Sequence, residues 1–401
     1  MRENQRVAAP RNALAREKGA VVIGGDYRAL GVVRSLGRRG IPVLLVIDDH
    51  WLAASSRFVH DRARMPAGGD LAKLQFLLRL AEERDLEGWT LIPTNDDAAQ
   101  LSAHHHARLG RHFLLTVPPW DTLRWAHDKR FTYALAERIG VAYPWTLAPG
   151  SADDLWKAAG HFPVLVKPAF KPTTNAFTAA KAWRADDRES LAAAYRAACE
   201  LVPADAVLVQ EFVRGSGASQ YSYAALVASG RPIASITARR VRQWPMSIGR
   251  ASTYVETVND AAVERAAELL LATIDYTGLV EIEFKKDESG TPQLLDINPR
   301  VWGWHSIGRR AGVDFPYLLW RLVHREPLEE IRGRVGIRWM RFMTDFPMAF
   351  REMLGGRLSP ASYLDAFAGR TEFAIFAKDD PMPALFELPM IAQLLLRRRG
   401  V

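Results

Sequence analysis

Short apolar runs alternate with helically spaced segments in the first 120 residues. The apolar runs, which are typical of buried strands, lie at 21–25, 41–48, 89–94 and 113–118. The helically spaced segments lie at 28–40 and 71–84. A strand, a helix and a second strand in succession indicate a βαβ unit, whose two strands pair in parallel. The pattern therefore predicts a doubly wound, Rossmann-like α/β domain at 20–120, preceded by a polar and frayed N-terminus at 1–19.

The pattern changes near Asp121. Residues 121–140 have helical spacing, with Asp121 as a candidate N-cap and Gly140 as the stop signal. Strand-like segments follow at 162–168, 206–213, 220–228, 231–241 and 280–300, and helical segments at 186–200 and 260–274. These segments predict an α+β region with a mostly antiparallel sheet at 121–330. A C-terminal extension at 331–401 follows, for which the sequence suggests no role beyond a strand candidate at 371–377.

The segment "VEIEFKKDESGTPQLLDINPR" at 280–300 is predicted to be a hairpin with Ser289 and Gly290 at its tip. Pairing Glu288 with Thr291 then places Val280, Ile282 and Phe284 opposite Pro299, Ile297 and Leu295, on one fully apolar face. That face is expected to pack on a core.

The other face of the hairpin gathers acidic and amide side chains. In the same register Glu283 lies opposite Asp296, and Glu281 lies opposite Asn298. Like charges that face each other across a ladder cost about 0.2–1 kcal/mol, whereas a hard divalent cation with oxygen ligands turns the repulsion into binding. The alternative is a solvated acidic face, which accounts for Glu281 but explains "DINPR" poorly.

Composition and charge narrow the class of protein. The chain has 401 residues with a net charge of +8, and its basic residues are scattered rather than interleaved with aromatic ones, so no nucleic-acid partner is expected. The single cysteine, Cys199, allows no intrachain disulfide. There is no apolar stretch long enough for a transmembrane segment and no secretory signal, so a cytoplasmic protein is expected.

Two lysines and one strand are candidates for nucleotide binding. Lys167 ends the apolar run "FPVLVKP", where a lysine at a sheet edge is the alternative reading. Lys129 follows Asp128 within a helical stretch, where a solvated lysine is the alternative. The segment "QEFV" at 210–213 ends a strand, and its backbone could present a carbonyl and an amide to an adenine edge.

Taken together, these features resemble the ATP-grasp superfamily. Lys129, Lys167, the "QEFV" strand and the hairpin occur in the order and at the separations found in its carboxylate–amine ligases. The phrase "NPRVWGWHSIGRRAGVDFPYLLW" resembles the predicted ATP-dependent carboligases related to biotin carboxylase. The resemblance covers about 20–325 and implies an ATP-grasp fold with an N-terminal Rossmann-like pre-ATP-grasp domain. It also implies an ATP-grasp domain of two lobes at 121–330, with ATP between the lobes.

The resemblance assigns roles to individual residues. It implies that Lys129 and Lys167 hold the ATP phosphates, that Gln210, Glu211, Phe212 and Val213 meet adenine, and that Gln220 stands at a ribose-binding position. It implies magnesium ligands at Glu283, Asp296 and Asn298, and catalytic roles for Arg300 and Lys167. Many members have a glycine-rich lid, but here the segment at 168–183 contains no glycine. Lys181 is expected to assist there.

The implied activity is that of an ATP-dependent ligase. It would activate a carboxylate as an acyl phosphate and join it to an amine, releasing ADP and phosphate. ATP and one or two Mg²⁺ ions, with Mn²⁺ as a substitute, are the implied cofactors, and small carboxylates and amines are the implied partners. A homodimer is left open. The alternatives are a thiol or bicarbonate substrate, or a nucleotide-binding protein without turnover. The glycine spacing of "GGDYRALG" at 24–31 disfavours NAD.

Substrate determinants are less sharply defined by the sequence. Arg239, Arg240 and Arg242 lie on a strand, where one could bind a carboxylate, although a charged strand edge explains them as well. Trp302, Trp304 and His305 could line an acyl or amine pocket, although large aromatic residues there are equally typical of a core. In "PTNDDA", Asn95 or Asp96 could touch substrate, and a helix N-cap is the alternative.

Overall fold

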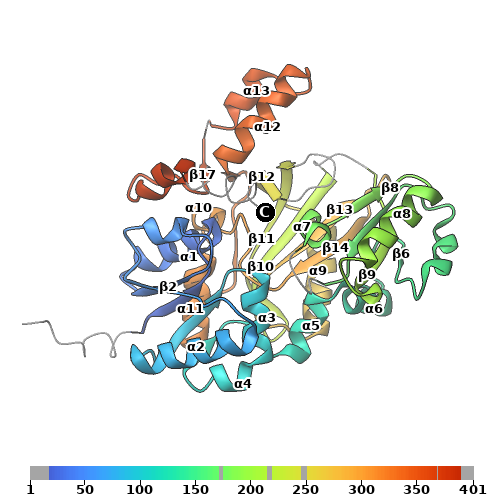
Figure 1. Cartoon of the computed structure of the whole chain (residues 1–401). Helices are drawn as coiled ribbons and strands as arrows, with labels where there is room; N and C mark the ends of the chain where they lie inside the picture. The colour runs from blue at the N-terminus through green and yellow to red at the C-terminus, as the bar shows by residue number, and fades with distance from the viewer. Residues whose placement is uncertain (1–17, 171–174, 215–218, 245–250, 368, 390–401) are drawn as a thin grey trace, which may run out of the picture.

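The protein is built on three β-sheets (Figure 1). The structure is a computed structural model that describes residues 18–170, 175–214, 219–244, 251–367 and 369–389. Most of the frayed N-terminus expected at 1–19 lies outside this range. None of the described helices is both long and apolar enough to cross a bilayer.

The first sheet is parallel, as predicted, with strand order β3-β2-β1-β4-β5. Its strands are β1 (Ala20–Ile23), β2 (Val43–Ile47), β3 (Asp61–Arg64), β4 (Trp89–Pro93) and β5 (Phe113–Leu115). Its helices are α1 (Tyr27–Gly37), α2 (Asp70–Glu83), α3 (Asp96–His104) and α4 (His106–Leu109), with a 3-10 turn η2 (Leu52–Ser55). Alternate residues of β1 enter two different cores, Val22 with α1 and Val21 with α2. The edge strand β3 was missed because its sequence, "DRAR", is polar.

The single helix predicted at 121–140 is two helices, α5 (Trp120–His127) and α6 (Lys129–Ile139). Asp128 between them is extended, and its carboxylate accepts a hydrogen bond from the backbone N of Arg130 at 2.9 Å. The predicted N-cap Asp121 is wrong, because Pro119 occupies that position. Gly140 ends α6 in the left-handed conformation, as predicted. The break makes Lys129 the first residue of a helix rather than a mid-helix residue.

The second sheet has eight strands and is mostly antiparallel, in the order β14-β13-β10-β11-β12-β16-β17, with β15 beside β11. Its strands are β10 (Gln220–Ala228), β11 (Arg231–Trp244), β12 (Ala251–Val258), β13 (Gly278–Lys286), β14 (Pro292–Asn298), β15 (Ile331–Arg332), β16 (Arg338–Met340) and β17 (Thr371–Phe373). The helices α9 (Ala261–Thr273), α10 (Ile307–Ala311) and α11 (Phe315–Val323) accompany it. The C-terminal extension thus contributes β15, β16 and β17 to the central sheet, of which the sequence predicted only β17, within its strand candidate at 371–377.

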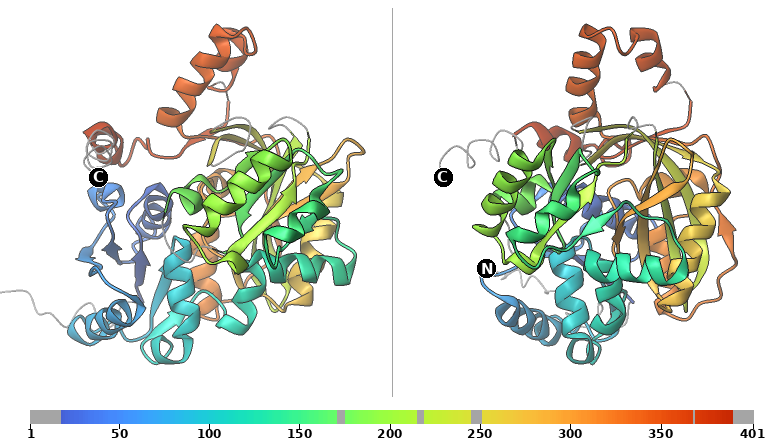
Figure 2. Two further views of the ribbon diagram at one scale, coloured as in Figure 1. Left: turned by 45° about the vertical axis from the view of Figure 1, so that its right-hand side comes forward. Right: turned by 90° about the vertical axis from the view of Figure 1, so that its right-hand side faces the viewer.

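The third sheet has four strands in the order β6-β9-β7-β8. Its strands are β6 (Thr146–Leu147), β7 (Val164–Pro168), β8 (Trp183–Ala185) and β9 (Val207–Glu211). Two helices, α7 (Ala176–Ala180) and α8 (Arg188–Cys199), and two 3-10 turns, η3 (Ala152–Ala158) and η4 (Ala204–Ala206), complete this part. Both views of Figure 2 place it as a separate layer beside the eight-stranded sheet.

The hairpin β13–β14 has the predicted register at its functional end. Glu283 pairs with Asp296 and Glu281 with Asn298. The turn is nevertheless one residue longer than predicted. The predicted tip had two residues between Glu288 and Thr291, whereas Asp287 N donates to Thr291 O and leaves three residues between them. A bulge beside Phe284, which faces Leu294 instead of the predicted Leu295, compensates for that extra residue. The apolar face packs in the predicted core, with Val280, Ile282 and Phe284 fully buried.

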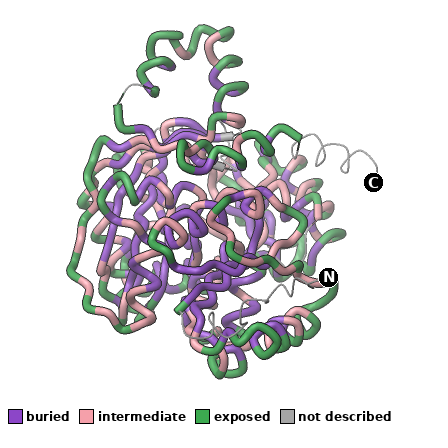
Figure 3. Tube along the Cα trace, turned by 90° about the vertical axis from the view of Figure 1, so that its left-hand side faces the viewer, coloured by how far each residue is buried: buried purple, intermediate pink, exposed green. Residues whose placement is uncertain are grey.

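Two helices form an arm that projects from the body, α12 (Phe342–Leu354) and α13 (Pro360–Asp365) (Figures 1 and 2). Most of the arm is exposed in Figure 3, in contrast to the buried strands below it. Its base is held by a buried ion pair, in which the Arg242 guanidinium lies 2.7 Å from the Asp345 carboxylate. Arg242 also lies over the Tyr254 ring, 4.1 Å from its centroid.

We expect Arg242→Met to lower the free energy of unfolding by about 3–5 kcal/mol, because it leaves the Asp345 carboxylate buried without its counter-charge. Urea denaturation of the two proteins measures the change. The double variant Arg242→Met/Asp345→Leu should recover much of the loss. Equal stability of Arg242→Met and the unmodified protein would contradict this role for the pair.

Candidate functional site

A cleft of about 480 Å³ lies where the three sheets approach one another. One wall comes from the hairpin β13–β14, a second from β7 and the segment after it, and a third from the loops that follow β1 and β4. The polar and charged residues that line it are Asp26, Tyr27, Arg28, Asp96, His127, Lys129, Lys167, Thr178, Lys181, Gln210, Gln220, Glu283, Asp296, Asn298 and Arg300. The structure therefore brings most of the predicted nucleotide, metal and catalytic residues together.

The two predicted phosphate-binding lysines have different surroundings. Lys129, at the start of α6, lies 2.8 Å from the Asp296 carboxylate. Lys167, at the end of β7, donates hydrogen bonds to the Tyr133 hydroxyl at 2.7 Å and to Gln210 Oε1 at 2.6 Å. Tyr133 in turn donates to the backbone carbonyl of Leu295, the bulge residue of the hairpin, at 2.7 Å. This chain of bonds fixes Lys167 relative to the hairpin without giving it a carboxylate partner.

Burial shapes the charge of Lys167. Removal from solvent, and secondarily the positive charge of Lys129, lowers the pKa of its ammonium to about 7, against the opposing effect of Asp296 and Glu283. An anion placed beside the ammonium would favour its charged form. Lys167 is thus a buried amine with two neutral hydrogen-bond partners and no carboxylate partner among the described residues.

Glu283 is held ionised despite its burial. Burial opposes its ionisation, but Arg240, Lys181 and the hydrogen bond from Asn298 together outweigh burial and lower the pKa of Glu283 to about 2. The Arg240 guanidinium lies 2.6 Å from the Glu283 carboxylate. Asn298 Nδ2 donates to Glu283 Oε1 at 2.9 Å, and Gln220 Nε2 donates to Glu283 Oε2 at 3.3 Å.

Glu281 shares the polar face with Glu283 but does not line the cleft. Its carboxylate accepts hydrogen bonds from Trp304 Nε1 at 2.7 Å and from Asn298 Nδ2 at 3.3 Å. Burial and the neighbouring Glu283 raise its pKa. Glu281 therefore supports Asn298 from behind the cleft, in agreement with its omission from the predicted ligand set.

The donor set fits a hard cation. Two carboxylates and an amide oxygen, from Glu283, Asp296 and Asn298, meet on one face of one hairpin, and such oxygen ligands suit Mg²⁺. Lys129 and Arg240 neutralise the two carboxylates in this structure. Among the described residues there is no group of three or more His, Cys, Asp or Glu side chains that could hold a metal. The proposed set instead combines two acids with an amide.

Arg300 connects the hairpin to the N-terminal sheet. Its guanidinium donates to Asp96 Oδ1 at 2.6 Å, to Asp96 Oδ2 at 3.1 Å and to Asn298 Oδ1 at 3.0 Å. Burial opposes the ionisation of Asp96, but Arg300, with smaller contributions from Arg28 and His127, holds the Asp96 pKa well below its usual range. In "PTNDDA" the N-cap alternative is confirmed for Asn95, which accepts a hydrogen bond from Ala98 N at 2.8 Å, and Asp96 lines the cleft.

Sequence reasoning missed the contribution of the β1–α1 loop. Asp26 caps α1 and forms an ion pair with Arg28 at 2.7 Å, and both line the cleft beside Tyr27. His127, the last residue of α5, also lines it, and burial lowers its pKa. The position of "DYR" directly after the first strand was the available signal, since ligands of open α/β sheets bind at the carboxyl ends of strands.

The predicted adenine segment divides between two hollows. Gln210 lines the cleft, whereas Glu211, Phe212 and Val213 line a neighbouring hollow of about 600 Å³. Trp145 and His161 also line this hollow and stack there, with ring centroids 4.0 Å apart.

The structure describes only part of the predicted lid at 168–183, because residues 171–174 lie outside the described residues. Thr178, Lys181 and Ala182 of the same segment line the cleft. Lys181 has a positive φ of 68° at the end of α7. The charge of Lys181 contributes to the low pKa of Glu283, after the larger effects of burial and Arg240.

None of the six predicted substrate residues lines the cleft, although all lie in the described part of the chain. The three arginines have carboxylate partners, Arg239 with Glu256, Arg240 with Glu283 and Arg242 with Asp345. The three aromatic residues Trp302, Trp304 and His305 are buried in the core. Burial lowers the His305 pKa to about 4. The core alternative therefore describes the three aromatic residues. The strand-edge alternative does not describe the arginines, because β11 lies between β10 and β12 and both Arg240 and Arg242 are buried.

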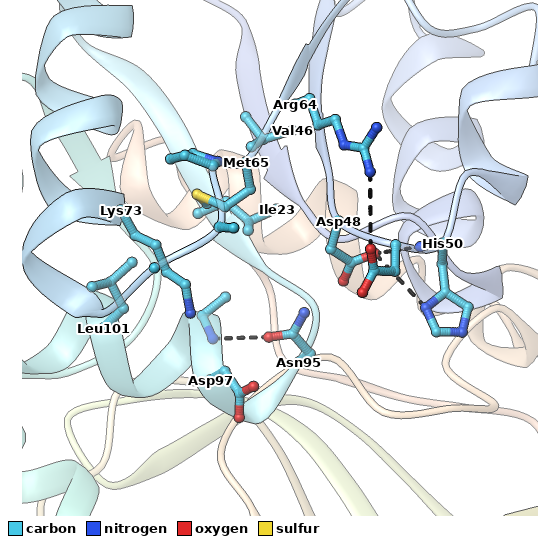
Figure 4. Close-up of a pocket in the computed structure, with 15 residues that line it drawn as sticks. Ile23, Val46, Asp48, His50, Arg64, Met65, Lys73, Asn95, Asp97 and Leu101 are labelled. Carbon is cyan, nitrogen blue, oxygen red and sulfur yellow. Dashed lines mark hydrogen bonds and ion pairs between the residues drawn. The ribbon is translucent and has the colours of Figure 1, made fainter. Parts of the chain in front are cut away.

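A larger hollow of about 860 Å³ lies at the carboxyl ends of β1 and β2 (Figure 4). Ile23, Val46 and Met65 contribute apolar side chains, with Asp48 and His50 toward one side and Lys73 toward the other. This hollow holds neither the opposed acids of the hairpin nor the buried lysines. The cleft, rather than the larger hollow, is therefore the candidate active site.

Comparisons with known proteins agree with this architecture. Residues 205–341 match the family described as "ATP-grasp in the biosynthetic pathway with Ter operon". A search of curated proteins finds no match.

Solved structures similar to the chain include the L-amino acid ligase from Bacillus licheniformis, with a TM-score of 0.62 and 17% identity, covering 78% of this chain and 75% of that chain. The biotin carboxylase domain of Hydrogenobacter thermophilus 2-oxoglutarate carboxylase, in complex with MgADP, ADP and bicarbonate, has a TM-score of 0.62 and 17% identity, with coverages of 80% and 74%. N5-carboxyaminoimidazole ribonucleotide synthetase from Thermus thermophilus has a TM-score of 0.58 and 16% identity, with coverages of 79% and 81%. The chain thus has the ATP-grasp fold, and its predicted resemblance to the ATP-grasp ligases related to biotin carboxylase is confirmed.

Proposed function

We propose that the protein is an ATP-dependent ligase that activates a carboxylate as an acyl phosphate and joins it to an amine. One observation carries this proposal: the cleft places Lys129, Lys167, Glu283, Asp296 and Arg300 around one space. These are the charges that phosphoryl transfer to a carboxylate requires, since that chemistry depends on positioning and charge neutralisation. The L-amino acid ligase among the structural neighbours supports the amide-forming reaction by its name.

In this proposal the lysines bind the phosphates of ATP. Lys167 lacks a carboxylate partner among the described residues, so a phosphate oxygen would complete its environment. Lys129 would exchange its contact with Asp296 for a phosphate contact, which leaves Asp296 available as a metal ligand. Glu283, Asp296 and Asn298 would hold Mg²⁺, which would neutralise phosphate charge when bound.

Arg300 would stabilise the charge on the transferred group. Its guanidinium lines the cleft and is held by hydrogen bonds to Asp96, to Asn298 and to the backbone carbonyl of Val301. The acyl phosphate would form when the substrate carboxylate attacks the γ-phosphorus of ATP and ADP departs. The amine would then attack the acyl carbon and expel phosphate.

The products of ATP cleavage test this reaction class. Incubation with MgATP and pools of amino acids and other small acids is expected to release ADP and inorganic phosphate together, measured by chromatography and a phosphate assay. Release of AMP and pyrophosphate would contradict the acyl-phosphate mechanism. Release of ADP that requires bicarbonate and no amine would replace the proposal with a carboxylase-type reaction.

A further inference from the structure

A second, separate cavity lies at the base of the helical arm. It has a volume of about 380 Å³, at the lower end of the range for small-molecule sites. Eight of its nine lining residues are apolar, among them Met340, Phe342, Phe373, Ile375 and Phe376. It is bounded by the first turn of α12, by β17 and the chain after it, and by the helical residues 382–389.

The ninth lining residue, Glu387, carries the one ionisable side chain among the described residues of this otherwise apolar cavity. Its side chain is buried, with the residue only 5% exposed. Its Oε1 atom has no hydrogen-bond partner among the described residues. A buried carboxylate oxygen without a hydrogen-bond partner is costly, and the methionine, phenylalanine and aliphatic side chains of this cavity wall offer it none. A cationic partner would remove that cost.

Arg341, whose positive charge acts on Glu387, does not supply this partner. Arg341 partly offsets the effect of burial on Glu387, but burial dominates and raises the Glu387 pKa. The Arg341 guanidinium instead lies over the Tyr27 ring, 4.3 Å from its centroid. No ion pair joins Arg341 to Glu387 in the described structure.

We propose that this cavity is a binding site for a small apolar amine, whose ammonium pairs with Glu387 and whose apolar body fills the space between α12 and β17. The Glu387 carboxylate would favour ligands with a positive charge, and the apolar walls would favour ligands with an apolar body. Phe342 and Phe376 are both partly exposed at 42% and 52%, which leaves the cavity open to solvent for ligand entry.

The site is distinct from the proposed active site. Arg341 and Tyr27 lie between the two, with Tyr27 lining the cleft and Arg341 stacked on it. The cavity and the cleft share no lining residue. Amine binding here therefore does not depend on the ligase activity, and it should persist when Lys167 in the cleft is replaced.

Calorimetry and thermal denaturation of the full chain with 2-phenylethylamine test the proposal. We expect saturable binding and a rise in Tm. We expect at least tenfold weaker binding of the neutral analogue 2-phenylethanol, and none of the acid 3-phenylpropionate. Glu387→Gln should weaken amine binding at least tenfold, whereas Glu352→Gln, on α12 but outside the cavity, should not change it. Lys167→Met should also retain binding.

Ala384→Phe provides an independent check, because it fills the cavity while leaving Glu387 in place. It should abolish amine binding even if Glu387→Gln fails to fold. The proposal is overturned if the amine shows no saturable binding, if 2-phenylethanol binds as tightly as the amine, or if folded Glu387→Gln binds the amine as the unmodified protein does. It is also overturned if Lys167→Met abolishes amine binding, which would place the amine in the cleft.

Discussion

Asp296→Asn is expected to lower kcat at least about 100-fold while leaving the fold intact. Asp296 contributes one of the two carboxylates of the proposed metal set, and it also positions Lys129 at 2.8 Å. An asparagine keeps the shape of the side chain but removes the charge that a hard cation and the lysine both require. Loss of a group that merely supports a metal ligand already costs about 10–100-fold, so loss of a ligand itself should cost more.

The measurement is the rate of MgATP-dependent phosphate release, with circular dichroism as the test of folding. Glu82→Gln, an exposed acid on α2 that is remote from the cleft, is the matched control and should keep full activity. A folded Asp296→Asn protein with near-normal turnover would remove Asp296 from the metal site. Higher Mg²⁺ concentrations should restore part of the activity if weaker metal binding is the cause.

Lys167→Met is expected to have the second largest effect, a loss of turnover combined with a gain in stability. The ammonium is buried and its hydrogen-bond partners, Tyr133 and Gln210, are both neutral. Without the Lys167 ammonium, a bound phosphate would lose a buried positively charged partner. The kcat/KM for ATP should therefore fall about 100-fold or more. Lys157→Met, at an exposed lysine far from the cleft, serves as the matched control.

The stability effect should depend on pH in a defined direction. The Lys167 pKa is about 7 in the folded protein, compared with 10.5 for an ordinary lysine. Below about pH 7 the side chain is charged in both states, so the folded protein bears the full cost of the buried charge. Between about pH 7 and 10.5 the unfolded chain alone holds the extra proton, so the folded protein gains relative stability as pH rises.

Replacing Lys167 should therefore stabilise the free protein most at or below pH 7. We expect a gain on the order of 1–3 kcal/mol, after subtraction of the two lost hydrogen bonds, which corresponds to a Tm rise of a few degrees. The gain should shrink toward pH 10. A lower Tm for Lys167→Met at pH 6 would show that the buried ammonium is not a destabilising group.

The candidate site was predicted best where local pattern determines geometry. The alternation of Val280, Ile282 and Phe284 fixed the two faces of the hairpin, and the core and cleft faces follow it. The pairing of Glu283 with Asp296 was also correct, but two errors cancelled there: the turn has one residue more than predicted and the bulge absorbs it. Turn length and bulges depend on packing against neighbouring strands, which the sequence of one hairpin does not contain.

Long-range pairing is what the sequence could not supply. Arg242 looked as available as Arg240 on the same strand, and only the fold brings Asp345 of the arm beside it. Likewise Arg300 and Asp96 are 204 positions apart, and their ion pair links the hairpin to the N-terminal sheet. The strands β15 and β16 are short and were not predicted, whereas β17 lies within the strand candidate at 371–377.

The central claim is that a carboxylate oxygen of the substrate attacks the γ-phosphorus of ATP. The most direct test uses organic acids labelled with ¹⁸O in the carboxylate, unlabelled ATP and an amine pool, with mass spectrometry of the released phosphate. The proposed mechanism predicts that each turnover transfers one ¹⁸O atom from the carboxylate to inorganic phosphate. Turnover that releases only unlabelled phosphate would contradict it.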